Sequence, residues 1–132
     1  MSIKAEHRVH FYETDQMGVV HHANYFRWFE LGRVEYLRAI GVTLGELIDD
    51  GILFPITEIE AKFHSPARYD DLVSIETTAV ELTKVKLVFD YRITRDDTLL
   101  VTGHSLNVFT DLESGKIIRV PDKYCEKFLQ RI

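Results

Sequence analysis

The pattern of apolar and polar residues changes its period partway along the chain. From Asn24 to Ile40, apolar residues recur at helical spacing and occupy most sides of the helix that they predict. Gly41 follows directly, as glycine often does just beyond the end of a helix. A helix with so broad an apolar surface is typical of a buried element. We therefore expect this helix to lie at the centre of the fold.

The remainder of the chain is dominated by alternating apolar and polar residues, which indicate β-strands. An early strand is expected to end near Tyr12, and a short helix is expected over residues 43–50, where Thr43 and Glu46 have the spacing of a capping box. Pro121 is well placed to open a last short helix. Turn-forming segments separate predicted strands over residues 52–63, 72–82, 85–93, 98–110 and 116–120.

These elements predict an α+β fold in which an antiparallel sheet wraps around one long central helix. The chain has 132 residues, of which 45% are hydrophobic, so residues 1–132 are expected to form a single domain with one core. The predicted helix is more apolar than one sheet can cover, and a sheet of this size has exposed edges. Both features favour self-association into a homodimer or homotetramer.

Composition and charge exclude several classes of partner. A formal net charge of −5 argues against nucleic-acid binding, which needs a basic face. No apolar run approaches the roughly 20 residues that span a bilayer, and the N-terminus lacks a signal-peptide core, so no membrane insertion is expected. The single cysteine, Cys125, has no partner for an internal disulfide, and we therefore expect a cytoplasmic protein.

The segment ahead of the long helix carries the candidate chemistry. Asp15 precedes a bend at Gly18 that leads into the helix. A helix start offers unpaired backbone N–H groups and a partial positive charge, and a nearby carboxylate supplies a base or a nucleophile. Together these groups suit attack on a carbonyl with stabilisation of the oxyanion. Taken alone, Asp15 also fits a turn residue or a helix cap, because aspartate is common at both.

The histidines do not predict a metal site. His7 and His10 are three residues apart on the expected first strand, which places them on opposite faces. Neither helix-spaced ligand pairs nor a cysteine cluster accompanies them. We therefore expect no bound metal.

The segment that leads into the long helix carries four motifs, namely Thr14-Asp15, Gly18-Val19-Val20, His22-Ala23-Asn24-Tyr25 and Trp28-Phe29-Glu30. In these motifs the chain resembles the hot-dog-fold acyl-CoA thioesterases of the 4-hydroxybenzoyl-CoA thioesterase-like family. The turn over residues 65–71 and the strands after it are similar to that family as well, so the resemblance covers nearly the whole chain. It implies hydrolysis of an acyl-CoA thioester to a free acid and coenzyme A, with no cofactor beyond the coenzyme A of the substrate.

The resemblance also implies roles for individual residues. Asp15 corresponds to the catalytic carboxylate, and His22 to the residue whose backbone N–H binds the thioester carbonyl. The His22 side chain is open to four further roles, namely direct proton transfer, orienting Asp15, lining the pocket or capping the helix. Substrate contacts are expected from Gly18, Val19, Asn24 and Tyr25, and contacts with the coenzyme A nucleotide and phosphates from Thr83, Lys84 and Lys86.

The reaction is chemically reasonable for such a site. The leaving thiol of a thioester has a pKa of roughly 8 to 9, so no strong general acid is required. Asp15 suits either a general base or a nucleophile, and Glu30 and Glu35 are the alternative carboxylates. The rival functions are an acyl-acyl-carrier-protein thioesterase, a hydratase or dehydratase, and a non-catalytic acyl-CoA-binding module.

Overall fold

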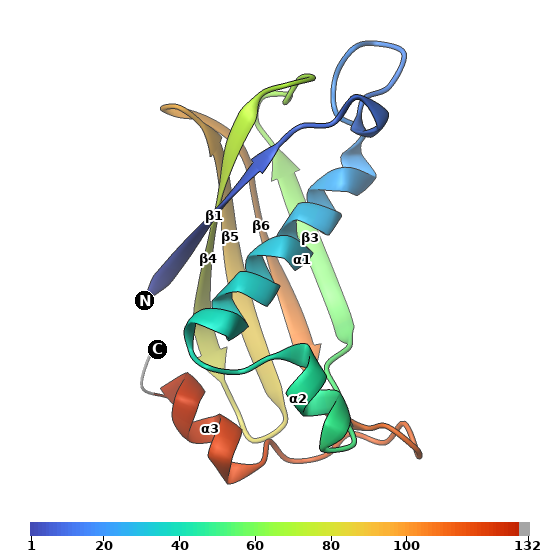
Figure 1. Cartoon of the computed structure of the whole chain (residues 1–132), viewed down its shortest axis with the longest axis vertical. Helices are drawn as coiled ribbons and strands as arrows, with labels where there is room; N and C mark the ends of the chain where they lie inside the picture. The colour runs from blue at the N-terminus through green and yellow to red at the C-terminus, as the bar shows by residue number, and fades with distance from the viewer. Residues whose placement is uncertain (130–132) are drawn as a thin grey trace.

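The computed structural model describes residues 1–129 of the chain. A five-stranded antiparallel sheet, in the order β1-β4-β5-β6-β3, curves around the long helix α1 (His22–Ala39) (Figure 1). The predicted α+β architecture with one central helix is therefore confirmed. The strands of the sheet are β1 (Ser2–Arg8), β3 (Ile56–Phe63), β4 (Leu72–Leu82), β5 (Lys86–Arg95) and β6 (Thr98–Val108).

The smaller elements lie around the ends of this sheet. The helices α2 and α3 lie at one end, and the loop that precedes α1 lies at the other (Figure 1). The capping box predicted from Thr43 and Glu46 is present at the start of α2. These elements are the 3₁₀ turn η1 (Phe11–Glu13), α2 (Leu44–Asp49), the paired strands β2 (Ile52–Leu53) and β7 (Thr110–Asp111), and α3 (Asp122–Leu129).

The core lies between α1 and the sheet. Phe29 of α1 stacks on Tyr91 of β5 with ring centroids 4.2 Å apart. Gly32 lets the helix approach β4 closely, because a Cβ at this position would lie 2.2 Å from Thr77 Oγ1. Gly103 of β6 makes room for the Phe29 ring in the same way, with 2.6 Å between its hypothetical Cβ and the ring. The helix is therefore buried against the sheet, as its composition predicts.

Three sequence-based boundaries are wrong. The first strand ends at Arg8 rather than near Tyr12, because residues 11–13 turn into η1. The predicted strand over 52–63 is divided at Phe54 and Pro55 into β2 and β3, since proline has no N–H to donate to a sheet. The predicted strand over 98–110 likewise forms two strands, β6 and β7.

Residues 116–120 do not form the predicted strand. Their backbone N–H groups donate to two separate segments, from Ile118 to Phe109 O at 2.9 Å and from Val120 to Lys84 O at 2.7 Å. A single bridge between Thr110 and Ile117 is their one strand-like pairing within residues 1–129. A strand needs one continuous neighbour, which this segment does not have.

Candidate active site

The loop that carries Asp15 is a tight turn held against a neighbouring turn. The Asp15 N–H donates to Val19 O at 2.8 Å, and the Gly18 N–H donates to Asp15 O at 3.1 Å. Gly18 adopts a φ of +78°, a conformation that glycine reaches without strain. Val20 N–H donates to Ala67 O at 2.9 Å, which fixes the far side of the loop.

The Asp15 carboxylate is exposed and only partly engaged. Its Oδ1 accepts a hydrogen bond from Met17 N at 2.8 Å and a longer one from Val19 N at 3.4 Å. Oδ2 receives no hydrogen bond from the part of the chain that the structure describes. Asp15 thus acts as a turn residue through one oxygen, while the other remains available for chemistry. The carboxylate borders a hollow of about 650 Å³ that is also lined by Tyr12 and Arg27.

The start of α1 presents a free backbone donor, the His22 N–H, beside this loop. His21 caps the helix, because its Nδ1 accepts from Ala23 N at 3.2 Å and its carbonyl accepts from Asn24 N at 2.9 Å. Among residues 1–129, no acceptor is bound to the His22 N–H. A free N–H at this position is what an oxyanion site requires. The helix cap is His21, so the capping role considered for the His22 side chain is wrong.

The His22 side chain instead lines a second hollow on the other side of the helix start. Its ring stacks on Phe63 of β3, with centroids 4.1 Å apart and planes 12° apart. Val19, Tyr25 and Pro66 complete much of the wall of this hollow, which has a volume of about 180 Å³. Phe63 lies at the end of an edge strand and is 44% exposed. The hollow therefore opens at the edge of the sheet.

Two residues expected to bind substrate use their polar groups within the protein. The Asn24 amide donates from Nδ2 to Glu13 O at 2.8 Å, and its Oδ1 accepts from Arg27 at 3.0 Å. The Tyr25 hydroxyl accepts from Ala67 N at 3.0 Å, and burial raises the pKa of this hydroxyl. These contacts fix the helix start and the neighbouring turn, while substrate contact by Asn24 or Tyr25 stays a prediction.

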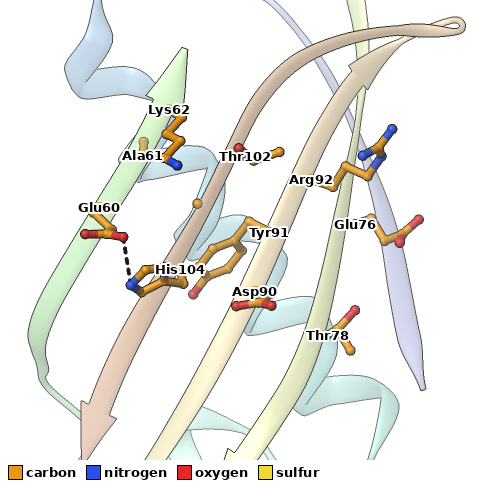
Figure 2. A pocket seen from close by; sticks show the side chains of 11 residues that line it. Glu60, Ala61, Lys62, Glu76, Thr78, Asp90, Tyr91, Arg92, Thr102 and His104 are labelled. Atoms are coloured by element: carbon orange, nitrogen blue, oxygen red, sulfur yellow. Dashed lines mark ion pairs between the residues drawn. The ribbon is translucent and has the colours of Figure 1, made fainter. Parts of the chain in front are cut away.

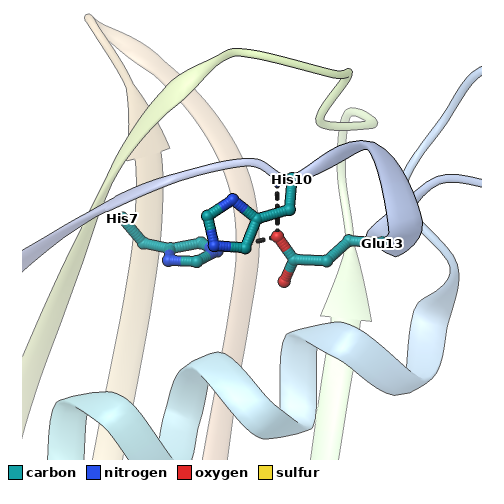
Figure 3. A group of neighbouring side chains, drawn as sticks. All are labelled: His7, His10 and Glu13. Carbon is teal, nitrogen blue, oxygen red and sulfur yellow. Dashed lines mark hydrogen bonds and ion pairs between the residues drawn. The ribbon is translucent and has the colours of Figure 1, made fainter.

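Glu13 was not found from the sequence, yet it is the most heavily bonded side chain at this end of the molecule. Its Oε1 accepts from His10 N at 2.7 Å and from His7 Nε2 at 2.8 Å (Figure 3). Its Oε2 accepts from Trp28 Nε1 at 2.7 Å. Burial raises the pKa of Glu13, but the bonds from the His10 backbone, His7 and Trp28 outweigh it and hold the pKa below its usual 4.5. Glu13 is thus a buried anion.

The expectation that His7 and His10 lie on opposite faces of a strand is also wrong. Because the chain leaves β1 at Arg8, the two rings meet with centroids 5.2 Å apart (Figure 3). Potential ligand atoms of His7, His10 and Glu13 lie within 4.8 Å of one another, and two histidines with a carboxylate can bind zinc. Both Glu13 oxygens, however, already accept hydrogen bonds. The absence of a metal here stays a prediction.

The residues expected to contact coenzyme A lie at the opposite end of the same chain. Thr83 and Lys84 lie in the turn between β4 and β5, and Lys86 is the first residue of β5, where its O accepts from Thr83 N at 2.9 Å. This turn lies beside α3, far from the loop before α1 (Figure 1). Lys84 is exposed, and Lys86 Nζ lies 3.9 Å from Glu81. One protomer does not bring these lysines to Asp15.

The remaining candidates are poorly placed for this chemistry. Glu30 is exposed on α1, and Glu35 pairs with Arg38 on the same helix. A third hollow, of about 450 Å³, lies on the face of the sheet that points away from α1 (Figure 2). Charged side chains line it, including the ion pair of Glu60 with His104 at 3.0 Å. No helix start borders that hollow.

A sheet curved around one long helix, with a carboxylate loop leading into the helix start, defines the hot-dog fold of thioesterases. The family model of the thioesterase-like superfamily matches residues 9–128. The acyl-CoA thioester hydrolase YbgC of Escherichia coli is 32% identical over 124 residues, which cover 93% of this chain and 92% of that protein. The chain belongs to the thioesterase-like superfamily and is a thioester hydrolase.

Solved structures confirm the fold and the resemblance to the 4-hydroxybenzoyl-CoA thioesterase-like family. The DHNA-CoA thioesterase from Staphylococcus aureus superimposes with a TM-score of 0.94 at 25% identity, covering 98% of this chain and 89% of that one. A mutant of 4-hydroxybenzoyl-CoA thioesterase, complexed with 4-hydroxybenzoyl-CoA, superimposes with a TM-score of 0.87 at 26% identity, covering 96% and 97% of the two chains.

Proposed function

We propose that this protein hydrolyses an acyl-CoA thioester to a free carboxylic acid and coenzyme A. The observation that carries the proposal is that one short segment carries both a free Asp15 Oδ2 and, at the helix start, a free His22 N–H. The names of YbgC and of the complexed 4-hydroxybenzoyl-CoA thioesterase support the acyl-CoA substrate. In the part of the chain that the structure describes, no helix is long and apolar enough to cross a membrane.

The two groups divide the chemistry between them. The His22 N–H donates to the thioester carbonyl oxygen, and the helix start stabilises the negative charge that develops on that oxygen. Asp15 removes a proton from the attacking water, or attacks the carbonyl carbon itself to form an anhydride that water then hydrolyses. In either route the C–S bond breaks, and the thiolate leaves without a strong acid because its pKa is roughly 8 to 9.

The coenzyme A end of the substrate requires a second copy of the chain. The Asp15 loop and the lysine turn over residues 83–86 lie at opposite ends of one protomer (Figure 1). Strand β3 is an edge strand whose outer side is unpaired among the described residues, and it exposes Ile56 and Phe63. Antiparallel pairing of β3 with the same strand of a second copy places opposite ends of the two protomers side by side. We therefore assign Lys84 and Lys86 to the site of the other subunit.

An acyl-carrier-protein thioesterase would use the same two groups. A protein carrier with an acidic surface requires a basic docking patch, and the net charge of −5 does not favour one. Turnover of an acyl-CoA thioester by the protein would exclude a non-catalytic binding module. Release of free thiol from a panel of acyl-CoA thioesters separates these functions and also identifies the acyl group.

The decisive comparison is between Asp15→Asn and His22→Ala. Asp15 acts through its side chain, so Asp15→Asn should lower kcat by about 10²- to 10⁴-fold. His22→Ala retains the backbone donor and should lose much less. Circular dichroism must show that both variants are folded. A folded Asp15→Asn protein that keeps nearly the wild-type kcat would overturn the mechanism, and a folded His22→Ala protein as inactive as Asp15→Asn would assign catalysis to the imidazole.

A further inference from the structure

We propose that Glu13 is a positioning residue, whose buried carboxylate and backbone carbonyl hold the Asp15 loop in a fixed position relative to the start of α1. The inference rests on the proposed function, because it concerns how Asp15 and the His22 N–H come to face the same carbonyl. Glu13 precedes Asp15 by two residues and is 5% exposed. Its contacts reach both neighbours of the loop, namely β1 with the turn after it and the first two turns of α1.

The carboxylate fixes where the chain enters the loop. The backbone N–H of His10 and the ring N–H of His7 both donate to Oε1 (Figure 3). The Trp28 indole N–H donates to Oε2. Trp28 is 1% exposed and belongs to α1, while His7 belongs to β1. One side chain therefore joins the strand and the helix on either side of the catalytic loop. Charge-assisted hydrogen bonds of this length are stronger than those between neutral groups.

The main chain of Glu13 makes the second connection. Its carbonyl oxygen accepts from Asn24 Nδ2 at 2.8 Å and from His21 N at 2.9 Å. Both donors belong to the start of α1, where His21 is the residue before His22 and Asn24 is two residues after it. The carbonyl that binds the helix start is thus two residues from Asp15. This short connection determines the separation between the Asp15 carboxylate and the His22 N–H.

The arrangement is stable because the anion has a complete set of donors. Within residues 1–129, Glu13 forms no ion pair with lysine or arginine, and His7 is its one ionisable hydrogen-bond donor. A buried carboxylate without hydrogen-bond donors carries a large desolvation cost, so loss of these hydrogen bonds to Glu13 would release the loop. Asp15 itself is exposed and cannot fix its own position through packing.

The test uses Glu13→Gln, which preserves the size of the side chain. An amide replaces one acceptor with a donor, so one of the bound N–H groups loses its partner. We expect kcat to fall by about 10- to 100-fold, as expected for a misplaced catalytic group, with KM changed by less than about three-fold. His7→Ala removes one of the three donors and should lower kcat by a smaller factor.

A double-variant cycle separates positioning from simple loss of stability. In the Asp15→Asn background there is no carboxylate to position, so adding Glu13→Gln should change the residual rate by less than about two-fold. The matched control is Ser105→Ala, which removes a buried hydrogen bond with Tyr91 far from the loop. This control should lower the melting temperature without lowering kcat.

The outcomes distinguish this inference from the proposed function. If Asp15→Asn is inactive but folded Glu13→Gln keeps the wild-type kcat, the positioning role is wrong and the proposed function stands. The positioning role is equally wrong if Glu13→Gln reduces the rate by the same factor with Asp15 present or replaced. If Asp15→Asn itself keeps nearly the wild-type kcat, the proposed function fails first.

Discussion

Subunit mixing tests whether one active site takes residues from two chains. The first parent carries Asp15→Asn, and the second carries Lys84→Ala together with Lys86→Ala. When equal amounts are unfolded and refolded together, random pairing gives heterodimers for half of all dimers. If the site takes Asp15 from one subunit and the lysines from the other, each heterodimer holds one intact site and one doubly altered site. The mixture should then show about a quarter of the wild-type rate.

The size of the lysine effect decides how clear this result is. Two charge-assisted contacts with phosphates that are partly open to solvent are worth about 2 kcal/mol together, which corresponds to about 30-fold in kcat/KM. If all the residues of one site came from a single chain, the kcat/KM of the mixture would be the mean of the two parental values. That mean is about 2% of the wild-type kcat/KM. The two arrangements therefore differ by roughly ten-fold at substrate concentrations well below KM.

The assay is the release of free thiol from an acyl-CoA substrate. A truncated pantetheine thioester, which lacks the nucleotide, is the control, and on this substrate the lysine parent should approach the wild-type rate. A mixture that never exceeds the mean of its parents would refute the two-chain site. Loss of activity by the lysine parent on both substrates would show that Lys84 and Lys86 act elsewhere.

Three further predictions follow from the fold. Gly32→Ala should lower the free energy of unfolding by about 1–3 kcal/mol despite the better helix propensity of alanine, because its Cβ meets Thr77 Oγ1, and adding Thr77→Ala should restore most of the loss in urea denaturation. Sedimentation at micromolar concentration should show at least a dimer, and a fully active monomer would contradict the β3 interface. Because the pKa of Glu13 is held below 4.5, its stabilising contribution is present above about that pH and is lost as the pH falls through the lowered pKa. In thermal unfolding, the difference between wild type and Glu13→Gln should therefore shrink in acid.

The sequence predicts the strands with one buried face and misplaces those without one. In β4 the residues at alternate positions are buried from Val73 to Ala79, and its bounds match the predicted 72–82. Strand β1 is an edge strand with no fully buried residue. Apolar and polar residues therefore alternate only weakly between Ser2 and Arg8. The predicted strand consequently extends to Tyr12, into the segment that forms the η1 turn.

The candidate site was predictable only where it is local in sequence. Asp15, Gly18 and His22 lie in one short segment, so their spacing indicates their proximity. Glu13 gains its role from His7 and Trp28, which come from a separate strand and helix and leave no spacing pattern. Glu13 follows His10 by three positions, which is the spacing of a capping box, but histidine is not a usual first member of that motif.

The contrast between Glu13 and Asp15 explains how two carboxylates so close in sequence can serve different purposes. Glu13 is buried, both of its oxygens accept hydrogen bonds, and its lowered pKa keeps it ionised. A carboxylate so fully bonded has little capacity to accept a proton or to attack a carbonyl. Asp15 is exposed and bonds the loop through Oδ1, which leaves Oδ2 for the substrate. In the proposed mechanism the chain thus uses one carboxylate to build the loop and the next one for the reaction, and the fixed Glu13 anion allows Asp15 to remain exposed without losing its position.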